Sequence, residues 1–185
     1  MATACFYYTT AVGEARAAPA ACYTAPMQQA IFAAGCFWGV QYYFDQIPGV
    51  VRTKAGYTGG TMENPSYEDV CTHRTGHAEA VWIEFDAAAV SYGTLVRHFF
   101  RMHDATQLNR QGPDIGDNYR SAIFYVTDSQ KEIAERGLRA AQQHTKRPIV
   151  TEITMAGPFY EAEAYHQKYA ERTGAGMCHV PYQPS

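Results

Sequence analysis

The residue with the clearest chemical potential is Cys36, which stands in the run Gly35-Cys36-Phe37-Trp38-Gly39. A short apolar run ends at Gly35, and apolar residues recur at helical spacing from Phe37 onward, so the pattern places the thiol in the first turn of a helix. Unpaired amides and the helix dipole favour an anion there, and the thiolate is the reactive form of cysteine. The spacing indicates a nucleophilic thiol, but it fits a buried cysteine packed between aromatic residues equally well.

A carboxyl group on an apolar strand face is the second chemical feature. Residues 77–85 alternate as a strand, which puts Glu79 on the same face as Val81 and Ile83. If that face is the core face, Glu79 points inward, and a desolvated carboxyl stays protonated near neutral pH and can act as a general acid. An edge position that reaches solvent, or an ion pair with an arginine, accounts for the same residue equally well.

The rest of the chain supplies the elements that must position these groups. Strands are expected at residues 30–34, 50–57, 77–85, 121–126 and 149–155. Helices are expected after Cys36 up to Pro48-Gly49, after Ser91, from Ser129 (with Glu132 in capping-box spacing) to about His144, and from Glu161 to about Arg172, where Gly174 stops the last one. Such a mixture is typical of an α/β or α+β sheet with helices packed on it.

Composition limits the class of protein. Hydrophobic residues make up 46 % of the 185 residues and charged residues 18 %, which is typical of a globular domain. The net charge of -3 argues against a general polyanion binder, and no apolar run is long enough to span a membrane. We predict no nucleic-acid or membrane partner.

The N-terminal segment differs from the rest of the chain. Residues 1–26 are rich in alanine and lack apolar periodicity, so we predict a flexible extension followed by a single catalytic domain at residues 27–185, with an irregular tail from about residue 175. The segment lacks the basic cluster and apolar region of a secretory signal. We expect a cytoplasmic protein, and organellar targeting by the extension stays open.

Five cysteines are spread along the chain: Cys5, Cys22, Cys36, Cys71 and Cys178. An odd number at wide spacing is a poor match to a disulfide framework. It is a better match to a reducing compartment with one or more reactive thiols.

Several motifs resemble, in their order and joint presence, the peptide methionine sulfoxide reductase A family. Besides the run around Cys36, they are Gly56-Tyr57-Thr58-Gly59-Gly60, Thr75-Gly76-His77-Ala78-Glu79-Ala80-Val81, Leu108-Asn109-Arg110-Gln111-Gly112, Tyr119-Arg120-Ser121 and Ala164-Tyr165-His166-Gln167. One such motif is weak, but all of them together, from about Met27 to Cys178, are highly specific. The resemblance implies an α+β fold with a central mixed β-sheet flanked by helices in a ferredoxin-like arrangement.

The resemblance also implies the reaction, which is reduction of the S epimer of methionine sulfoxide, free or in proteins, for repair after oxidation. Cys36 would attack the sulfoxide sulfur and become a sulfenic acid, while Glu79 would protonate the oxygen. A second thiol would then form a redox-active disulfide, which thioredoxin would reduce. No metal or organic cofactor is implied. Oxidised peptides and a thioredoxin-type reductant are the expected partners of what we take to be a monomer.

Residue by residue, the resemblance assigns the remaining parts of the site. Tyr67 and Tyr119 would hydrogen-bond the sulfoxide oxygen. The substrate-binding residues are Phe37 and Trp38, which would hold the methyl group, and Asp114 and His166, which would contact the substrate.

The resolving thiol is predicted to be Cys178, because it follows Gly174 and Gly176 in a tail that can reach the active site, where the family often carries this cysteine. Cys71 is the alternative, since it lies between Tyr67 and Glu79 in the sequence.

Four positions depart from the family pattern, and one of them is Asn118, which stands where glutamine is common. Pro113 stands where asparagine is usual, and its fixed φ can move the loop that carries Asp114. Asp117 adds a negative charge near the mouth of the site. His73 replaces a usual glycine and is strained if that position needs a positive φ. We expect these changes to affect substrate preference and rate more than reaction type.

Two other functions use some of the same residues. A metal-binding module could be built on Cys71, His73 and His77, with His179, but no paired Cys-x-x-Cys knuckle is present. A cysteine hydrolase would pair Cys36 with a histidine and would turn over esters or amides without any reductant.

Overall fold

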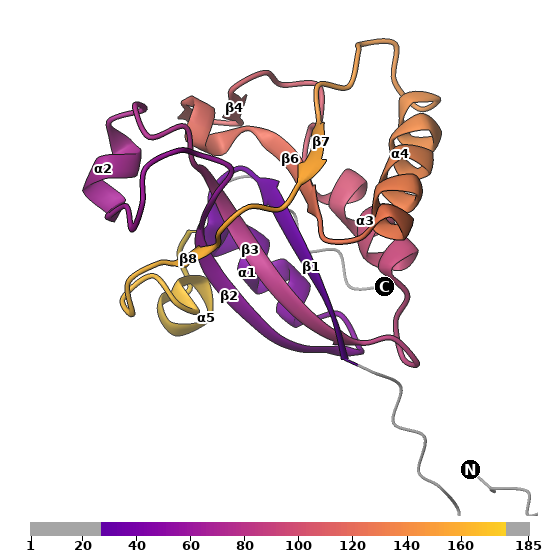
Figure 1. Cartoon of the computed structure of the whole chain (residues 1–185), viewed down its shortest axis with the longest axis horizontal. Coiled ribbons are helices and arrows are strands. Elements are labelled where there is room, and N and C mark those ends of the chain that lie inside the picture. The colour runs from indigo at the N-terminus through magenta and orange to yellow at the C-terminus, as the bar shows by residue number, and fades with distance from the viewer. Residues whose placement is uncertain (1–26, 177–185) are drawn as a thin grey trace, which may run out of the picture.

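A six-stranded mixed sheet organises the computed structural model, which describes residues 27–176. The strands follow the order β7 (Glu152–Met155), β6 (Ser121–Tyr125), β1 (Met27–Ala34), β3 (Ala78–Asp86), β2 (Val50–Thr58) and β8 (Tyr160–Glu161), as Figure 1 shows. Neighbouring strands are antiparallel, except β6 and β7, which are parallel. The predictions about residues 1–26, Cys178 and the tail beyond residue 176 lie outside the described residues.

The helices are α1 (Phe37–Asp45), α2 (Tyr67–Cys71), α3 (Tyr92–Met102), α4 (Asp128–Gln142) and α5 (Tyr169–Thr173), with a 3₁₀ turn η1 (Asp117–Tyr119). Strands β4 (Arg110–Gln111) and β5 (Asp114–Ile115) form a separate small hairpin. No helix among residues 27–176 has the length and apolar character needed to cross a membrane.

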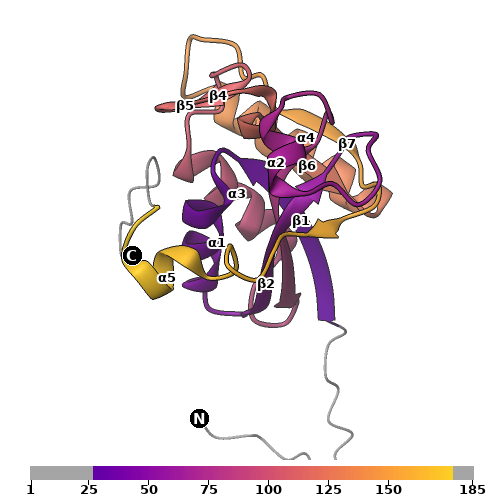
Figure 2. The same cartoon turned by 90° about the vertical axis from the view of Figure 1, so that its left-hand side faces the viewer.

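The central strands have the ferredoxin-like order β6-β1-β3-β2, in which the units β1-α1-β2 and β3-α3-β6 interleave. This confirms the α+β fold that the resemblance implies. Figure 2 shows α1 and α3 together on one side of the sheet.

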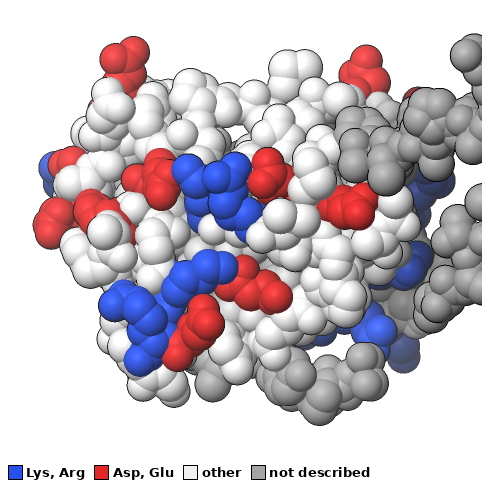
Figure 3. Space-filling view, turned by 90° about the horizontal axis from the view of Figure 1, so that it is seen from below, with Lys and Arg blue, Asp and Glu red and all other residues white. Residues whose placement is uncertain are grey.

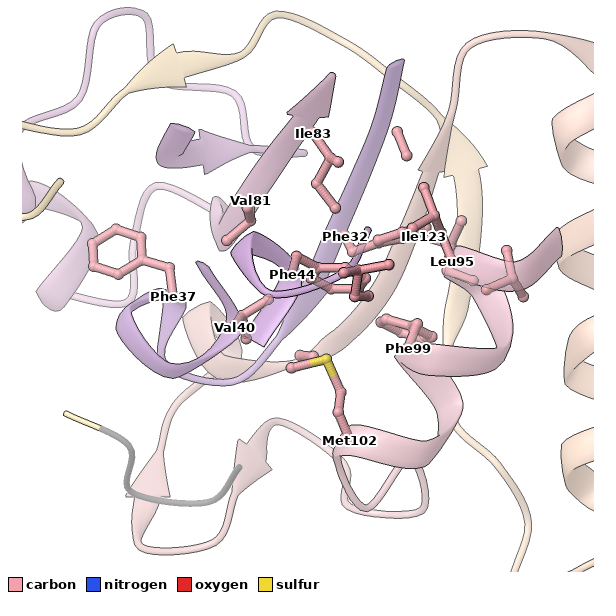
Figure 4. Packing of buried hydrophobic residues seen from close by; sticks show 14 of the residues in the cluster. Phe32, Phe37, Val40, Phe44, Val81, Ile83, Leu95, Phe99, Met102 and Ile123 are labelled. Carbon is pink, nitrogen blue, oxygen red and sulfur yellow. The ribbon is translucent and has the colours of Figure 1, made fainter. Parts of the chain in front are cut away.

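The main core lies between that sheet face and the helices. Phe32 of β1 packs against Phe44 of α1 and Phe99 of α3, with ring centroids 5.4 Å and 5.3 Å away. All three side chains are fully buried, and each such burial stabilises the fold by about 1.5–3 kcal/mol. Figure 4 shows Phe37 at the opposite end of this cluster from Phe99. Phe37, the first residue of α1, is therefore a core residue at the edge of the cluster.

The other sheet face carries a smaller cluster built largely from alanines of β1, β3 and β6. Small side chains allow a segment without regular structure to lie close to the sheet. In Figure 1 the chain between β7 and β8 crosses this face, and Ala156 and Phe159 of that segment pack on the cluster. Both faces of the sheet are therefore covered.

The start of α4 differs from the prediction. Ser129 lies inside the helix, and the N-cap is Thr127, whose Oγ1 accepts the N–H of Gln130 at 3.2 Å. Thr127 and Gln130 have the same capping spacing as Ser129 and Glu132, so the sequence is compatible with two N-termini for α4. The earlier start is the one used, because the side chain of Gln130 also accepts the N–H of Val126 at 3.0 Å.

The predicted helix from Glu161 to Arg172 is wrong for most of its length, because Glu161 lies in β8 and helix forms only in α5. The side chain of Gln167 holds the intervening chain against β2, through bonds of 2.9 Å to both the N–H and the C=O of Ala55. Lys168 follows with a φ of 54°, which interrupts any helix. Gly174 ends α5 in the left-handed conformation, as predicted.

Charges of both signs are interspersed on the face shown in Figure 3. The ion pairs at the surface include Arg52 with Glu84 and Arg147 with Asp104, at 3.3 Å and 2.8 Å. On this face the alternation agrees with the small net charge of the chain.

Candidate active site

Cys36 is the N-cap residue of α1, at the point where β1 ends and the helix begins. Gly35 has a φ of 93°, a left-handed value that lets the chain turn sharply between the two elements. The Cys36 side chain is only 8 % exposed. The predicted placement at a helix start is confirmed, and so is the helical face of α1, whose Phe37, Val40 and Phe44 are buried.

Glu79 lies beside this helix start and points into the core. Its carboxyl Oε2 accepts the backbone N–H of Phe37 at 3.0 Å, and the residue is only 2 % exposed. The first amide of α1 thus ties the carboxyl to the residue next to the thiol. Of the alternatives that the sequence left open, the inward-facing one is correct.

Burial raises the pKa of Glu79 to about 8, because a charged carboxylate is poorly solvated there. The hydrogen bond from Phe37 and the amide of Asn118 favour the charged form, and the negative charge of Asp114 disfavours it. Desolvation raises the pKa of Glu79 by more than the hydrogen bonds from Phe37 and Asn118 lower it, so the carboxyl keeps its proton at neutral pH. It is therefore a proton donor held beside a thiol.

Two tyrosines face the same carboxyl. Burial raises the pKa of the Tyr119 hydroxyl, and the nearby charges of Glu79 and Cys36 raise it further. Burial also raises the pKa of Tyr67, with added effects from Cys71 and Glu79. Both hydroxyls therefore stay protonated and can donate hydrogen bonds to an oxygen bound near Glu79.

An aromatic wall stands on the other side of the helix start. The indole Nε1 of Trp38 donates to Nδ1 of His166 at 3.0 Å, and the His166 ring lies 5.2 Å from Phe37 and 4.5 Å from Tyr67. The outer face of Trp38 stacks on Tyr169 of α5, with centroids 3.9 Å apart. The structure thus brings Phe37, Trp38 and His166 together as the sequence predicted.

Asp114 and Asn118 supply buried polar atoms near Glu79. Oδ2 of Asp114 is buried and has no hydrogen-bond partner among residues 27–176, while the buried Asn118 amide lies against Glu79 and Tyr119. Unpaired buried polar atoms are costly to leave unsatisfied, so they point to a polar ligand. Pro113 lies in the turn between β4 and β5, where the ladder does not need its missing amide, so the turn that carries Asp114 accommodates it.

His73 and Asp117, two of the departures from the family pattern, meet each other. His73 has a φ of 56°, so the position does require the strained left-handed conformation considered from the sequence. Its Nδ1 lies 3.4 Å from Oδ1 of Asp117 at the start of η1, and both side chains are partly exposed. The two substitutions therefore form one contact between the loop after α2 and the turn that carries Tyr119.

The other cysteine in the described chain, Cys71, is exposed on α2, and its thiol lies next to the Tyr67 hydroxyl. Residues 27–176 contain no group of three or more metal-ligand side chains, and His179 of the metal hypothesis lies outside this range. His77 instead fastens a loop, accepting the N–H of Gly60 at 3.1 Å and bonding the C=O of Met62 at 2.8 Å.

Sequence reasoning missed Glu163, which lies under the aromatic wall. Its Oε2 accepts the Tyr57 hydroxyl at 3.0 Å, and its Oε1 accepts the backbone N–H of Tyr67 at 2.9 Å. It precedes His166 by three residues, inside the segment that had been predicted as an ordinary helix. No periodicity or motif separates it from the other surface glutamates.

Comparisons with known proteins agree with this geometry. A family model described as "Peptide methionine sulfoxide reductase" matches residues 28–185. "Peptide methionine sulfoxide reductase MsrA" of Geobacter sulfurreducens is 54 % identical over 154 residues, 82 % of this chain and 95 % of that protein. The reduced form of Mxr1 from Saccharomyces cerevisiae has a TM-score of 0.79 at 29 % identity, covering 84 % of this chain and 93 % of its own. Mxr1 in complex with Trx2 is similar in fold, with a TM-score of 0.56 at 24 % identity over 78 % and 85 % of the two chains.

Proposed function

This chain belongs to the peptide methionine sulfoxide reductase family, and we propose that Cys36 is its nucleophile, Glu79 its general acid and Cys178 its resolving cysteine. The enzyme reduces the S epimer of methionine sulfoxide to methionine. The assignment of roles is ours, and it rests on the described geometry.

One observation carries these roles, which is the bond from the Phe37 amide to the Glu79 carboxyl. It keeps a protonated carboxylic acid, with a pKa of about 8, within one residue of a buried thiol at a helix start. A sulfoxide is reduced when its sulfur is attacked while its oxygen is protonated. A proton donor and a thiol fixed side by side are the two groups that this step needs.

The steps balance as follows. The Cys36 thiolate attacks the sulfoxide sulfur and an S–S bond forms, while Glu79 gives a proton to the oxygen, the S–O bond breaks and hydroxide is released. Hydroxide then attacks the Cys36 sulfur, the S–S bond breaks, and methionine leaves with Cys36 oxidised to a sulfenic acid. The Cys178 thiol then attacks that sulfur, water leaves, and a disulfide forms. An external dithiol restores both thiols by exchange. The sum is methionine sulfoxide plus a dithiol giving methionine, a disulfide and water.

The surrounding residues orient the substrate in this scheme. Tyr67 and Tyr119 donate hydrogen bonds to the sulfoxide oxygen, and Phe37 and Trp38 enclose the methyl group. The unpartnered carboxylate oxygen of Asp114 supports its role as a polar contact for bound substrate. The short distances from His166 to Phe37 and Tyr67 support its role in the same wall.

The path of the chain near Trp38 supports Cys178 as the resolving thiol. A Cβ atom added at Gly176 would lie 2.9 Å from Cε3 of Trp38 and 3.3 Å from Cδ1 of Tyr169, so the backbone of residue 176 runs directly against the indole ring. Two further residues extend the chain by at most about 7 Å. The described chain thus lies against Trp38, two residues after Cys36, at a point two residues before Cys178 in the sequence.

We further propose thioredoxin as the dithiol and residues 27–185 as a single catalytic domain. Mxr1, a neighbour in fold, has been crystallised in complex with Trx2. A protein dithiol of this kind supplies both the electrons and the surface contact that exchange requires.

Mass spectrometry after timed quenching tests the roles. Mixed with a methionine sulfoxide peptide and no reductant, the enzyme is expected to form about one methionine per chain and a Cys36–Cys178 disulfide. Cys178→Ser should form the same methionine but stop at a Cys36 sulfenic acid, which a dimedone-type reagent traps. Cys71→Ser is the matched control and should behave as wild type. A Cys36–Cys71 link would instead make Cys71 the resolving thiol.

A further inference from the structure

The aromatic wall next to Cys36 depends on which nitrogen of His166 carries the proton. The Trp38 indole N–H can only donate a hydrogen bond, and it points at Nδ1 of His166 at 3.0 Å. Nδ1 must therefore present a lone pair. A neutral His166 then carries its proton on Nε2.

Nε2 of His166 faces Glu163. The nitrogen is buried without a hydrogen-bond partner among residues 27–176, and Oε2 of Glu163 lies 3.9 Å away. Burial lowers the pKa of His166, which favours the neutral ring. Partial burial raises the pKa of Glu163, but hydrogen bonds from its own amide, Tyr67 and Tyr57 outweigh it and leave the pKa below its ordinary value, so the carboxylate is charged. A negative charge at this place favours a proton on Nε2.

The same carboxylate braces two other parts of the wall. Its bond to the Tyr57 hydroxyl holds a ring that packs 5.8 Å from Phe37. Its bond to the Tyr67 amide holds the first residue of α2. One charged side chain thus lies behind Phe37, Trp38 and Tyr67 while touching none of the atoms that react.

We propose that Glu163 is a positioning residue that fixes the Nε2–H tautomer of His166 and thereby the orientation of the Trp38 ring that holds the substrate methyl group. The proposal rests on the function assigned above to Trp38. It extends that function to a residue outside the wall itself.

Replacement by glutamine tests the role of the charge at nearly constant shape. In Glu163→Gln an amide NH₂ must take the place of one carboxylate oxygen. It then faces either the Tyr67 N–H, which leaves two donors opposed, or the Nε2–H of His166. In the second case the NH₂ group and the Nε2–H of His166 are opposed donors. Moving the His166 proton to Nδ1 removes that clash, but the proton then opposes the Trp38 N–H. Either outcome disturbs the wall.

Two spectroscopic readouts are direct. Long-range ¹H–¹⁵N spectra of the imidazoles, with His166→Asn used for assignment, should show Nε2–H in wild type and a substantial Nδ1–H population in Glu163→Gln. The indole N–H of Trp38 should shift in the variant. Trp82, whose indole N–H donates to Gln29 at 2.9 Å, is an internal control that should not shift.

Kinetics separate positioning from chemistry. We expect KM for a methionine sulfoxide peptide to rise about tenfold in Glu163→Gln, which corresponds to one hydrogen bond to a charged group, with a smaller change in first-turnover kcat. Glu161→Gln is the matched control, because Glu161 pairs with Lys54 at the surface on the preceding strand. It should leave both constants and both spectra unchanged.

An Nδ1–H tautomer in wild type overturns the proposal without any variant, and so does a Glu163→Gln protein whose His166 and Trp38 signals match wild type. The spectra do not depend on turnover. A wild-type protein that fails to reduce methionine sulfoxide therefore contradicts the assigned function and leaves this test intact.

Discussion

The two ends of β3 carry the same kind of side chain in opposite states. Glu79, near the start of the strand, is 2 % exposed and has a pKa raised to about 8 by burial. The side chain of Glu84, near the end, is 28 % exposed and pairs with Arg52 across the sheet at 3.3 Å. Glu84 lies five positions after Glu79, and this odd offset puts the two side chains on opposite faces of the strand.

The difference shows that the place in the fold, and not the residue type, decides whether a carboxyl keeps its proton at neutral pH. Glu84 has a cationic partner on β2, and Arg52 in turn lies 5.4 Å over the Trp82 ring. Within residues 27–176, the charged form of Glu79 is favoured by the Phe37 backbone amide and the Asn118 side-chain amide, and by no cation. The solvated end of β3 stabilises a charged carboxylate, and the buried end under α1 favours a neutral carboxyl group.

The largest effect should come from removing the thiol at the buried end. Cys36→Ser is expected to abolish methionine formation, because a serine hydroxyl can neither attack the sulfoxide sulfur as a thiolate does nor form a sulfenic acid. Methionine release from a sulfoxide peptide measures it. Cys71→Ser, the same change at an exposed thiol, should keep full first-turnover activity. Turnover by the Cys36→Ser variant would show that Cys36 is not the nucleophile.

The next largest effect should distinguish the two glutamates directly. Glu79→Gln is expected to slow the methionine-forming step by about 10²–10⁴-fold, the usual contribution of a general acid. Glu84→Gln should leave the rate unchanged. Rapid-quench single turnovers at saturating peptide measure both. Equal rates for the two variants would mean that the proton comes from another group.

The pH dependence of the rate follows from the same pKa. Because we propose Glu79 as the proton donor, we expect the wild-type single-turnover rate to fall as pH rises through about 8. Glu79→Gln should lack this decrease, while Glu84→Gln should keep it. A wild-type profile that stays level up to pH 9.5 would contradict Glu79 as the donor.

The pH dependence of the free energy of unfolding should also distinguish the two ends of β3. The pKa of Glu79 is about 8 in the folded chain, against an ordinary value of 4.5 that applies to the unfolded chain, so between these pH values folding keeps a proton that the unfolded chain has lost. The associated stability is fully present below pH 4.5 and is lost as pH rises to about 8, a total of roughly 5 kcal/mol.

Glutamine cannot ionise, so Glu79→Gln should become more stable relative to wild type by up to that amount as pH rises over this range. Urea unfolding at pH 4.5, 6 and 8 measures it. Glu84→Gln should show no such trend, and a parallel pH dependence of wild type and Glu79→Gln would argue against a buried neutral carboxyl.

The smallest effect is expected at the solvated end. Glu84→Gln removes one partner of a surface ion pair and should lower the free energy of unfolding by at most about 1 kcal/mol, less at high salt. Denaturant midpoints at low and high salt measure it. A loss above 2 kcal/mol would show that this end is less solvated than its exposure indicates.

Local patterns in the sequence predicted the elements of the fold well. The helical spacing of Phe37, Val40 and Phe44 and the alternation around Glu79 both describe contacts within one element, and both are confirmed. The longest error, in the segment before α5, occurs where a distant group decides the structure, whereas the errors at the starts of α2 and α4 concern local capping. Gln167 overrides the helical pattern before α5 by bonding Ala55 of β2, 112 residues away in sequence. The capping box of α2, formed by Ser66 and Asp69, was not anticipated.

The sequence by itself determined that Cys36 lies at a helix start and that Glu79 lies on an apolar strand face, because these follow from the helical spacing and from the period of two in a strand. The class of reaction was implied by the joint presence of the family motifs. Only the tertiary structure decided that Glu79 lies under the first amide of α1, that His73 meets Asp117, and that Glu163 stands behind the aromatic wall. The physical reason is that burial and pairing depend on neighbours brought from far along the chain. The pKa of a carboxyl group therefore depends on its surroundings in the fold and cannot be predicted from its position in the sequence alone.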